Sequence, residues 1–352
     1  MKALSSSLIP HHYRLSSSHS KSKQLKPNPQ LLVFPIRASV LPLKPIVVVG
    51  SANADIYLEI PRLPNPGETI TASTGHTLAG GKGANQACCG GKLAHPTYFL
   101  GQVGVDGHGR LIEEALEEGD VMIDGMRKVD GVPTGHAVVM LMDGGENSIV
   151  VVGGANMQNW PESLGVDDID VLRNAGIVLL QREIPDWVNI QVAETAKNAG
   201  VPVILDVGGR DEPIPNQLLK QIDILSPNET ELARLTGMPT ETPSEISQAV
   251  SVLHDMGVKQ VLVKLGAKGS VLFVEGEEEI WQPVIEASKV VDTTGAGDTF
   301  TAAFAVALVE GKTRNECLKF AAAAASLCVQ VKGAIPSMPE RDSVIKLLLC
   351  HS

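Results

Sequence analysis

The chain has 352 residues, of which 43% are apolar and 20% charged, ordinary values for a soluble globular protein of one or two domains. Only 3% of the residues are aromatic and the formal net charge is −11, so the sequence lacks the stacking platforms and positive charge that nucleic-acid binding uses. No apolar run approaches the roughly 18–20 residues that span a bilayer, and five cysteines are too few for a disulfide framework.

The first 44 residues differ in composition from the rest of the chain. They contain no acidic residue, seven Lys or Arg, and serine triplets at 5–7 and 16–18. This composition predicts a transit peptide for the chloroplast, with the mitochondrion as the less favoured alternative. The stretch 34–39 is similar to the processing region of chloroplast transit peptides, so we expect cleavage near Ala38. Residues 45–352 keep all 40 acidic but only 22 of the 29 basic residues, which gives them a net charge of −18.

Short apolar strands alternate with amphipathic helices after this leader. The β-branched run 46–49 precedes Gly50 and predicts a buried strand. Further strands are predicted at 98–103, 177–181, 203–207, 223–226, 261–265 and 270–274. Helices are predicted at 83–93, 108–118, 187–199, 229–236, 244–256, 297–309 and 315–329. Connections too long for hairpins favour an α/β fold, with a mostly parallel sheet and helices on both faces.

Two regions, 56–78 and 121–152, interrupt the alternation. They contain extended segments separated by turn residues, such as Asn65-Pro66-Gly67. We expect these segments to form a small β-sheet that serves as a lid over a ligand site. Residues 45–352 are therefore interpreted as one domain with a lid.

Polar and glycine-rich motifs follow several of the predicted strands. In an open parallel sheet, ligands bind beyond the carboxyl ends of the strands, so these motifs indicate where chemistry occurs. The motifs are SANAD at 51–55, GGKGAN at 80–85, QRE at 181–183, SPNE at 226–229 and DTTGAGDT at 292–299.

The motif at 292–299 has the most specific chemistry. Its Gly-Ala-Gly turn opens a helix and leaves backbone N–H groups at the positive end of the helix dipole, where a phosphate can bind. Asp298 beside this turn suits a base that takes a proton from an attacking hydroxyl during phosphoryl transfer. The alternative is an ordinary N-cap aspartate.

Two familiar nucleotide fingerprints do not fit the chain. The stretch 80–83 lacks the glycine spacing of a Walker A loop and the Ser or Thr that follows its Lys. No predicted strand is followed by a complete G-x-G-x-x-G with a later acidic residue, so nicotinamide binding has little support.

Taken together, the motifs resemble those of the PfkB family of carbohydrate kinases over residues 46–345. The matching segments are GSANAD at 50–55, PGET at 66–69, GGKGANQA at 80–87, VGVDGHG at 103–109, TG at 134–135, GGAN at 153–156, SPNETE at 226–231, LGAKG at 265–269, DTTGAGDTF at 292–300 and KGAIPS at 332–337. The resemblance implies a Rossmann-like domain with a β-sheet lid that pairs between the subunits of a homodimer. GSANAD and GGKGANQA are most similar to the branch of the family that phosphorylates D-ribose on its 5-hydroxyl with ATP.

The resemblance also implies roles for individual residues. Those implied to bind the sugar are Asn53, Asp55, Gly81, Lys82, Asn85, Glu183 and Asp298. Asp298 is implied as the catalytic base, with Gly295, Ala296 and Gly297 donating to the developing charge. Those implied to bind ATP are Asn228, Lys264, Leu265, Gly266, Ala267, Lys268, Gly269 and Gly297, with Glu231 acting indirectly on Mg²⁺. Those implied to hold an activating K⁺ are Asp292, Thr294, Gly333 and Ser337.

Three residues depart from the family pattern, and two alternatives stay open. Ala94 stands where the family usually has Gly or Ser, and Ala322 stands where it often has a polar residue near the nucleotide base. Arg182 is an unusual cation at its position, and we expect it either to pair with Glu183 or to face solvent. One alternative is a family kinase for deoxyribose, fructose or adenosine. The other is a catalytically silent organellar subunit, against which the intact turn and Asp298 argue.

Overall fold

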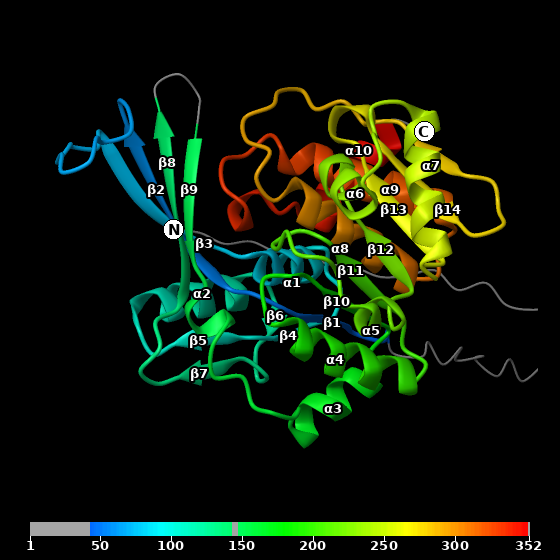
Figure 1. Cartoon of the computed structure of the whole chain (residues 1–352), viewed down its shortest axis with the longest axis horizontal. Coiled ribbons are helices and arrows are strands. Elements are labelled where there is room, and N and C mark those ends of the chain that lie inside the picture. Colours follow the sequence, from blue (N-terminus) through cyan, green and yellow to red (C-terminus); the bar gives the residue numbers. More distant parts are fainter. Residues whose placement is uncertain (1–42, 143–146, 351–352) are drawn as a thin grey trace, which may run out of the picture. The chain divides into compact units, whose positions relative to one another are not determined.

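A nine-stranded β-sheet forms the centre of the computed structural model, which describes residues 43–142 and 147–350 (Figure 1). Its strand order is β15-β14-β13-β12-β11-β10-β1-β4-β6. Strand β14 runs antiparallel to both of its neighbours, β13 and β15, and all other neighbouring strands pair in parallel. The strands are β1 Ile46–Val49, β4 Thr97–Leu100, β6 Val121–Met122, β10 Ile177–Leu180, β11 Val203–Asp206, β12 Ile224–Ser226, β13 Gln260–Lys264, β14 Ser270–Val274 and β15 Ile280–Gln282.

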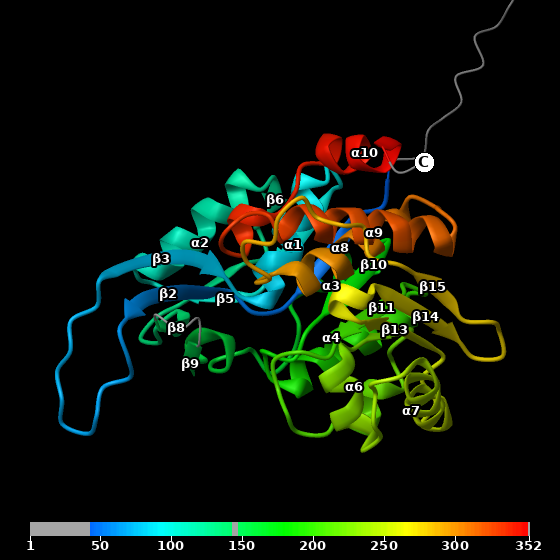
Figure 2. The ribbon, with the colours of Figure 1, turned by 90° about the horizontal axis from the view of Figure 1, so that it is seen from above.

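Two layers of helices cover the faces of this sheet (Figure 2). In β1, Ile46 and Val48 contribute to the core on one face, and Val47 and Val49 contribute to the core on the other. The first face packs against α1 Lys82–Lys92, α2 Gly107–Glu118, α8 Ala296–Val309, α9 Arg314–Cys328 and α10 Arg341–Cys350. The second packs against α3 Val166–Arg173, α4 Asp186–Asn198, α5 Asn216–Leu219, α6 Glu229–Thr236 and α7 Pro243–Asp255. Burial on both faces explains why the central strands are continuously apolar.

A separate four-stranded sheet begins three residues after β1 and is seen beside the main sheet in Figure 1. Its order is β3-β2-β8-β9. Strands β2 and β8 pair in parallel, and the other two neighbouring pairs are antiparallel. The strands are β2 Asn53–Ile60, β3 Thr74–Gly80, β8 Gly135–Met142 and β9 Asn147–Val152. The expected α/β architecture with a mostly parallel sheet and a second, small sheet is thus confirmed.

The structure differs from the sequence-based expectation at several elements. The predicted strand 98–103 divides at Gly101 into β4 and β5 Gln102–Gly104, because the chain turns where a side chain at 101 would collide with the Phe99 ring. Residues 121–129 do not join the small sheet: β6 extends the main sheet, and β7 Arg127–Val129 pairs with β5. Helices α3, α5 and α10 were not predicted.

The expected targeting segment at 1–44, with its cleavage position near Ala38, lies outside the described residues except for Leu43 and Lys44. None of the helices in the described part of the chain is long and apolar enough to cross a membrane.

Candidate active site

Asp298 lies where the N-termini of α1 and α8 approach each other. Its carboxylate accepts hydrogen bonds from Asn85 Nδ2 at 2.9 Å and from Gln86 Nε2 at 3.2 Å, both on α1. Gly295, with φ of 79°, is the N-cap residue of α8, so the alternative of an N-cap aspartate at 298 is wrong. The left-handed backbone at Gly295 favours glycine and turns the chain into the helix. The three residues Gly295, Ala296 and Gly297 therefore open the helix beside a buried carboxylate.

Lys82 supplies the nearest positive charge to this carboxylate. Its Nζ is 3.9 Å from Asp298 Oδ1. Burial raises the pKa of Asp298 above its ordinary value, and the positive charge of Lys82 opposes this shift. The negative charge of Asp298 in turn raises the pKa of Lys82, so the ammonium stays charged. The pair combines an acceptor that can take a proton with a cation that can attract an anionic group.

Asp55, on β2, is a second carboxyl group at this site. Burial, followed by the negative charges of Glu183 and Asp298, raises its pKa to about 7. A side chain at Gly80 would collide with the Asp55 carboxylate, and Gly81 has a φ of 90°, which lets the chain pass close to Asn53. Three carboxylates therefore converge on the glycine turn that precedes α1.

The polar groups around this turn are held by hydrogen bonds. Glu183 Oε2 accepts from Ser51 Oγ at 2.5 Å and from the Lys82 backbone N–H at 3.1 Å. Asn156 Nδ2 donates to Asn53 Oδ1 at 2.7 Å, and the Asn156 side chain also pairs with the backbone of Ala52 at 2.9 and 3.0 Å. Such fixed acceptors suit a ligand with several hydroxyl groups.

The residues expected to bind ATP lie along the carboxyl ends of β12 and β13. Asn228 and Glu231 cap α6 reciprocally, each through a hydrogen bond of 2.8 Å. Asn228 forms a β-bridge with Lys264, the last residue of β13. The following residues, Leu265 to Gly269, form a turn that the Lys268–Glu229 ion pair of 2.9 Å ties to α6. The structure thus brings Lys264 to the centre of the site and leaves Lys268 at its exposed edge.

The expected cation-binding residues also come together. The Asp292 carboxylate accepts from the backbone N–H of Thr294 at 2.9 Å and of Gly333 at 2.8 Å. Cys328 Sγ lies 3.8 Å from the Thr294 carbonyl oxygen and 3.1 Å from Ser337 Oγ. Carboxylate, carbonyl and hydroxyl oxygens are suitable ligands for a hard cation. The donor set therefore fits a potassium ion beside the 295–297 turn.

A divalent metal has fewer protein ligands to use. Within residues 43–142 and 147–350, no three His, Cys, Asp or Glu side chains form a group that could hold a metal ion. A side chain at Gly208 would have Lys82 Nζ at 2.7 Å and Glu231 Oε1 at 3.0 Å, so the Glu231 carboxylate reaches the same space as Lys82. This arrangement fits Mg²⁺ that is held mainly by phosphate oxygens and water.

Several residues of the site were not identified from sequence. Gln86 follows the assigned Asn85 in the GGKGANQA motif, and its Oε1 accepts from Gln181 Nε2 at 2.7 Å. Asp206 ends β11 and pairs with Lys264. A polar residue at the carboxyl end of a buried strand was the available signal for Asp206. Arg182 is fully buried and pairs with Asp186 at 2.8 Å, so neither expectation for its side chain was right.

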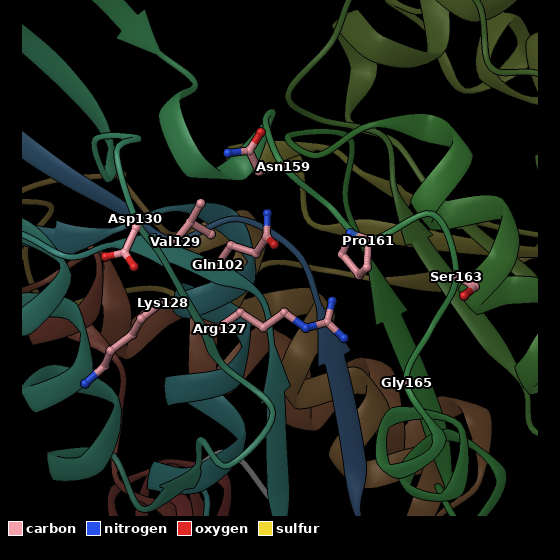
Figure 3. A pocket seen from close by; sticks show the side chains of 9 residues that line it. All are labelled: Gln102, Arg127, Lys128, Val129, Asp130, Asn159, Pro161, Ser163 and Gly165. Carbon is pink, nitrogen blue, oxygen red and sulfur yellow. The ribbon is translucent and has the colours of Figure 1, made fainter.

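A cavity of about 510 Å³ lies elsewhere, between β5, β7 and the segment 159–165 (Figure 3). Its cationic side chains are already neutralised, Arg127 by Asp168 and Lys128 by Glu113. None of the motif residues assigned above lines this cavity. The motif residues therefore gather around Asp298 and not around this cavity.

Comparisons with known proteins show the family of the chain. The model of the pfkB family carbohydrate kinases matches residues 43–341. A ribokinase of Arabidopsis thaliana is 71% identical over 306 residues, 86% of this chain and 81% of the relative. A ribokinase of Haemophilus influenzae is 34% identical and is covered over 98% of its length, against 87% of this chain. The solved structure of Arabidopsis thaliana ribokinase complexed with ribose and ATP has a TM-score of 0.85, covering 87% of this chain and 98% of that one.

Proposed function

Since the chain belongs to the pfkB family of carbohydrate kinases, we propose that it transfers the γ-phosphoryl group of ATP to the 5-hydroxyl of D-ribose. The observation that carries this proposal is the buried Asp298, placed beside the Gly-Ala-Gly turn and within 3.9 Å of Lys82. The 71% identity with a ribokinase favours ribose over the other sugars and nucleosides considered.

The reaction needs a base, and Asp298 supplies it. Its carboxylate takes the proton of the sugar hydroxyl as the sugar oxygen forms a bond to the γ-phosphorus. The bond from that phosphorus to the oxygen shared with the β-phosphate breaks, and its electron pair leaves with ADP. Gly295, Ala296 and Gly297 offer backbone N–H groups at the α8 N-terminus to the charge on the transferred group. The elevated pKa of Asp298 makes the carboxylate a better proton acceptor than an exposed aspartate.

The sugar lies against the carboxylates of Asp55, on β2, and Glu183, which follows β10. Asp55 and Asn53 accept hydrogen bonds from ribose hydroxyls, and Glu183, Lys82, Asn85 and Gly81 complete the pocket. The elevated pKa of Asp55 supports this role, because hydroxyl donors relieve a buried carboxylate that has the negative charges of Glu183 and Asp298 near it.

ATP lies over the carboxyl ends of β12 and β13. Asn228 and the segment 264–269 face the nucleotide, and Glu231 acts on Mg²⁺ through water. When bound, Mg²⁺ neutralises phosphate charge. Asp292, Thr294, Gly333 and Ser337 would hold K⁺, which would order the neighbouring 295–297 turn. The fit of the oxygen donors described above supports the K⁺ assignment.

The small sheet is proposed to act as a lid and to pair with the lid of a second copy. Strand β9 is an edge strand, and its residues Ile149, Val150, Val151 and Val152 are all exposed. Exposed apolar edge strands are poorly tolerated by monomers, which supports a homodimer. Light scattering on a Val151→Lys variant tests this: we expect a monomer, and an unchanged dimer would contradict the proposal.

Residues 1–44 are proposed to direct the chain to the chloroplast. Their acid-free, serine-rich and basic composition supports this destination. A fluorescent protein fused after residue 44 should enter plastids, and fluorescence elsewhere in the cell would contradict the proposal.

The position of phosphorylation gives the sharpest test of the reaction. The protein is incubated with ATP, Mg²⁺, K⁺ and D-ribose, and the sugar product is identified by phosphorus and carbon NMR. We expect phosphate on the 5-oxygen. Phosphate on the anomeric oxygen, or ADP formed without a sugar phosphate, would refute the assignment.

A further inference from the structure

A buried ion pair joins two strands of the main sheet behind the 295–297 turn. Lys264 ends β13, Asp206 ends β11, and Lys264 Nζ lies 2.6 Å from Asp206 Oδ2. The side chains are only 13% and 2% exposed. Because β12 lies between β11 and β13, the pair bridges over the carboxyl end of that strand. A pair in this place loses most of its hydration.

Helix α8 contributes a third member to this cluster. Thr301 Oγ1 donates to Asp206 Oδ2 at 3.0 Å, and Lys264 Nζ lies 3.5 Å from the same hydroxyl. Gly297 is one helical turn before Thr301 and therefore on the same face of α8. A Cβ placed on Gly297 would lie 3.8 Å from Lys264 Nζ. The ammonium is thus next to the turn at which the phosphoryl group is expected.

The donors of the lysine are not all used. An ammonium group has three N–H donors, and Asp206 and Thr301 account for the contacts of Lys264 Nζ within the described residues. One donor is therefore left for a ligand. Lys82 occupies the Asp298 side of the same turn, so the two lysines flank it at adjacent residues.

Stability alone is a weak reason for such a pair. Removing two charges from water costs free energy that their attraction often fails to recover, and apolar residues of similar size join strands equally well. Asp206 and Thr301 instead hold the ammonium at one position beside the turn before the substrate arrives, which is useful where positive charge is needed.

We propose that Lys264 is a further catalytic residue, whose ammonium group binds an oxygen of the transferred phosphoryl group at the 295–297 turn. This inference rests on the proposed function. The lysine neutralises charge on the γ-phosphoryl oxygens while the bond to the ADP oxygen breaks and the bond to the sugar oxygen forms. Asp206 and Thr301 are positioning residues that fix the lysine beside the turn.

The double variant Lys264→Met with Asp206→Asn tests the proposal, because it removes both charges and leaves no lone buried aspartate. With the sugar that the unmodified protein phosphorylates, we expect kcat to fall by about 10²–10³ and the sugar KM to stay within about threefold. The matched control is Lys128→Met with Glu113→Gln, which removes a surface ion pair of 2.8 Å and should leave kcat unchanged.

A second double variant separates charge from structure. Lys264→Gln with Asp206→Asn can keep a hydrogen bond across the strands but carries no ammonium, and it also serves if the Met variant does not fold. We expect the same loss of kcat. Recovery of kcat to within about threefold, or a rise in the ATP KM with kcat unchanged, would overturn the proposal. Turnover of ribose by the unmodified protein tests the proposed function. The role of Lys264 is tested separately, by the ratio of the variant kcat to the unmodified kcat with whichever sugar is phosphorylated.

Discussion

Asp55 should make the ligand-free protein less stable as pH rises, and Asp55→Asn should remove this effect. Burial and the neighbouring Glu183 and Asp298 raise the pKa of Asp55 from 3.8 to about 7. The folded state therefore binds the proton more tightly than the unfolded state, so the free energy of unfolding falls between these two pH values. The pKa difference of about three units, at 1.36 kcal/mol per unit, lowers the free energy of unfolding by at most about 4 kcal/mol above pH 7. Below pH 3.8 the contribution of Asp55 vanishes.

Urea unfolding of both proteins from pH 4 to pH 8 measures this effect. We expect the two free energies of unfolding to converge near pH 4 and the Asn variant to be more stable by about 2–4 kcal/mol at pH 8. The control is Asp124→Asn, which removes the same charge from an exposed turn between β6 and β7. A constant difference between the Asp55 variant and the unmodified protein across the pH range would refute the electrostatic reasoning.

The same carboxyl group should control sugar binding. If ribose hydroxyls donate to ionised Asp55, kcat/KM for ribose falls as the group is protonated, by about tenfold from pH 8 to pH 6 for a pKa of about 7. The Asn variant should bind ribose weakly at both pH values. Unaltered ribose kinetics in that variant would exclude Asp55 from the sugar pocket.

Three further predictions address other parts of the structure. Asp298→Asn can still accept a hydrogen bond from Asn85, so it should fold normally while kcat falls by about 10²–10⁴; steady-state kinetics that retain near-full kcat would reject Asp298 as the base. Asp292→Asn weakens the proposed K⁺ site, so the K⁺ concentration for half-maximal activation should rise severalfold, whereas an unchanged concentration would reject that site. Ala94 has a left-handed backbone with φ of 55°, which costs about 1–2 kcal/mol for a residue with a Cβ, so Ala94→Gly should raise the unfolding free energy by about 0.5 kcal/mol after the added chain entropy. A lower thermal midpoint for that variant would contradict the strain argument.

The local pattern predicts the repeating part of the fold well. The run 46–49 is apolar on both faces because helices cover both, and the glycine turns at 80–83 and 295–297 open helices where expected. Strand 98–103 was predicted as one element because nothing in its apolar pattern shows that the chain turns at Gly101. The two-residue strand β6 forms by pairing with β4, and the residues next to β6 in the sequence do not predict this pairing.

The sequence also predicts only part of the candidate site. Motif residues such as Asn85 and Asp298 meet because their helices begin at the same edge of the sheet. The pairing of Asp206 with Lys264 depends on three strands lying in the order β11-β12-β13, a relation that no local pattern contains. Arg182, by contrast, pairs with Asp186 only four residues later, at the first residue of α4. Tertiary arrangement decides the partners of charged side chains that lie far apart in the sequence.

The central claim, that the site phosphorylates ribose with ATP, is tested most directly by ATP turnover in a coupled assay. The protein is given D-ribose, deoxyribose, fructose or adenosine in turn, with Mg²⁺ and with K⁺ or Na⁺. We expect the highest kcat/KM with ribose, and more activity with K⁺ than with Na⁺. Absence of turnover with ribose while fructose or adenosine is phosphorylated would contradict the claim.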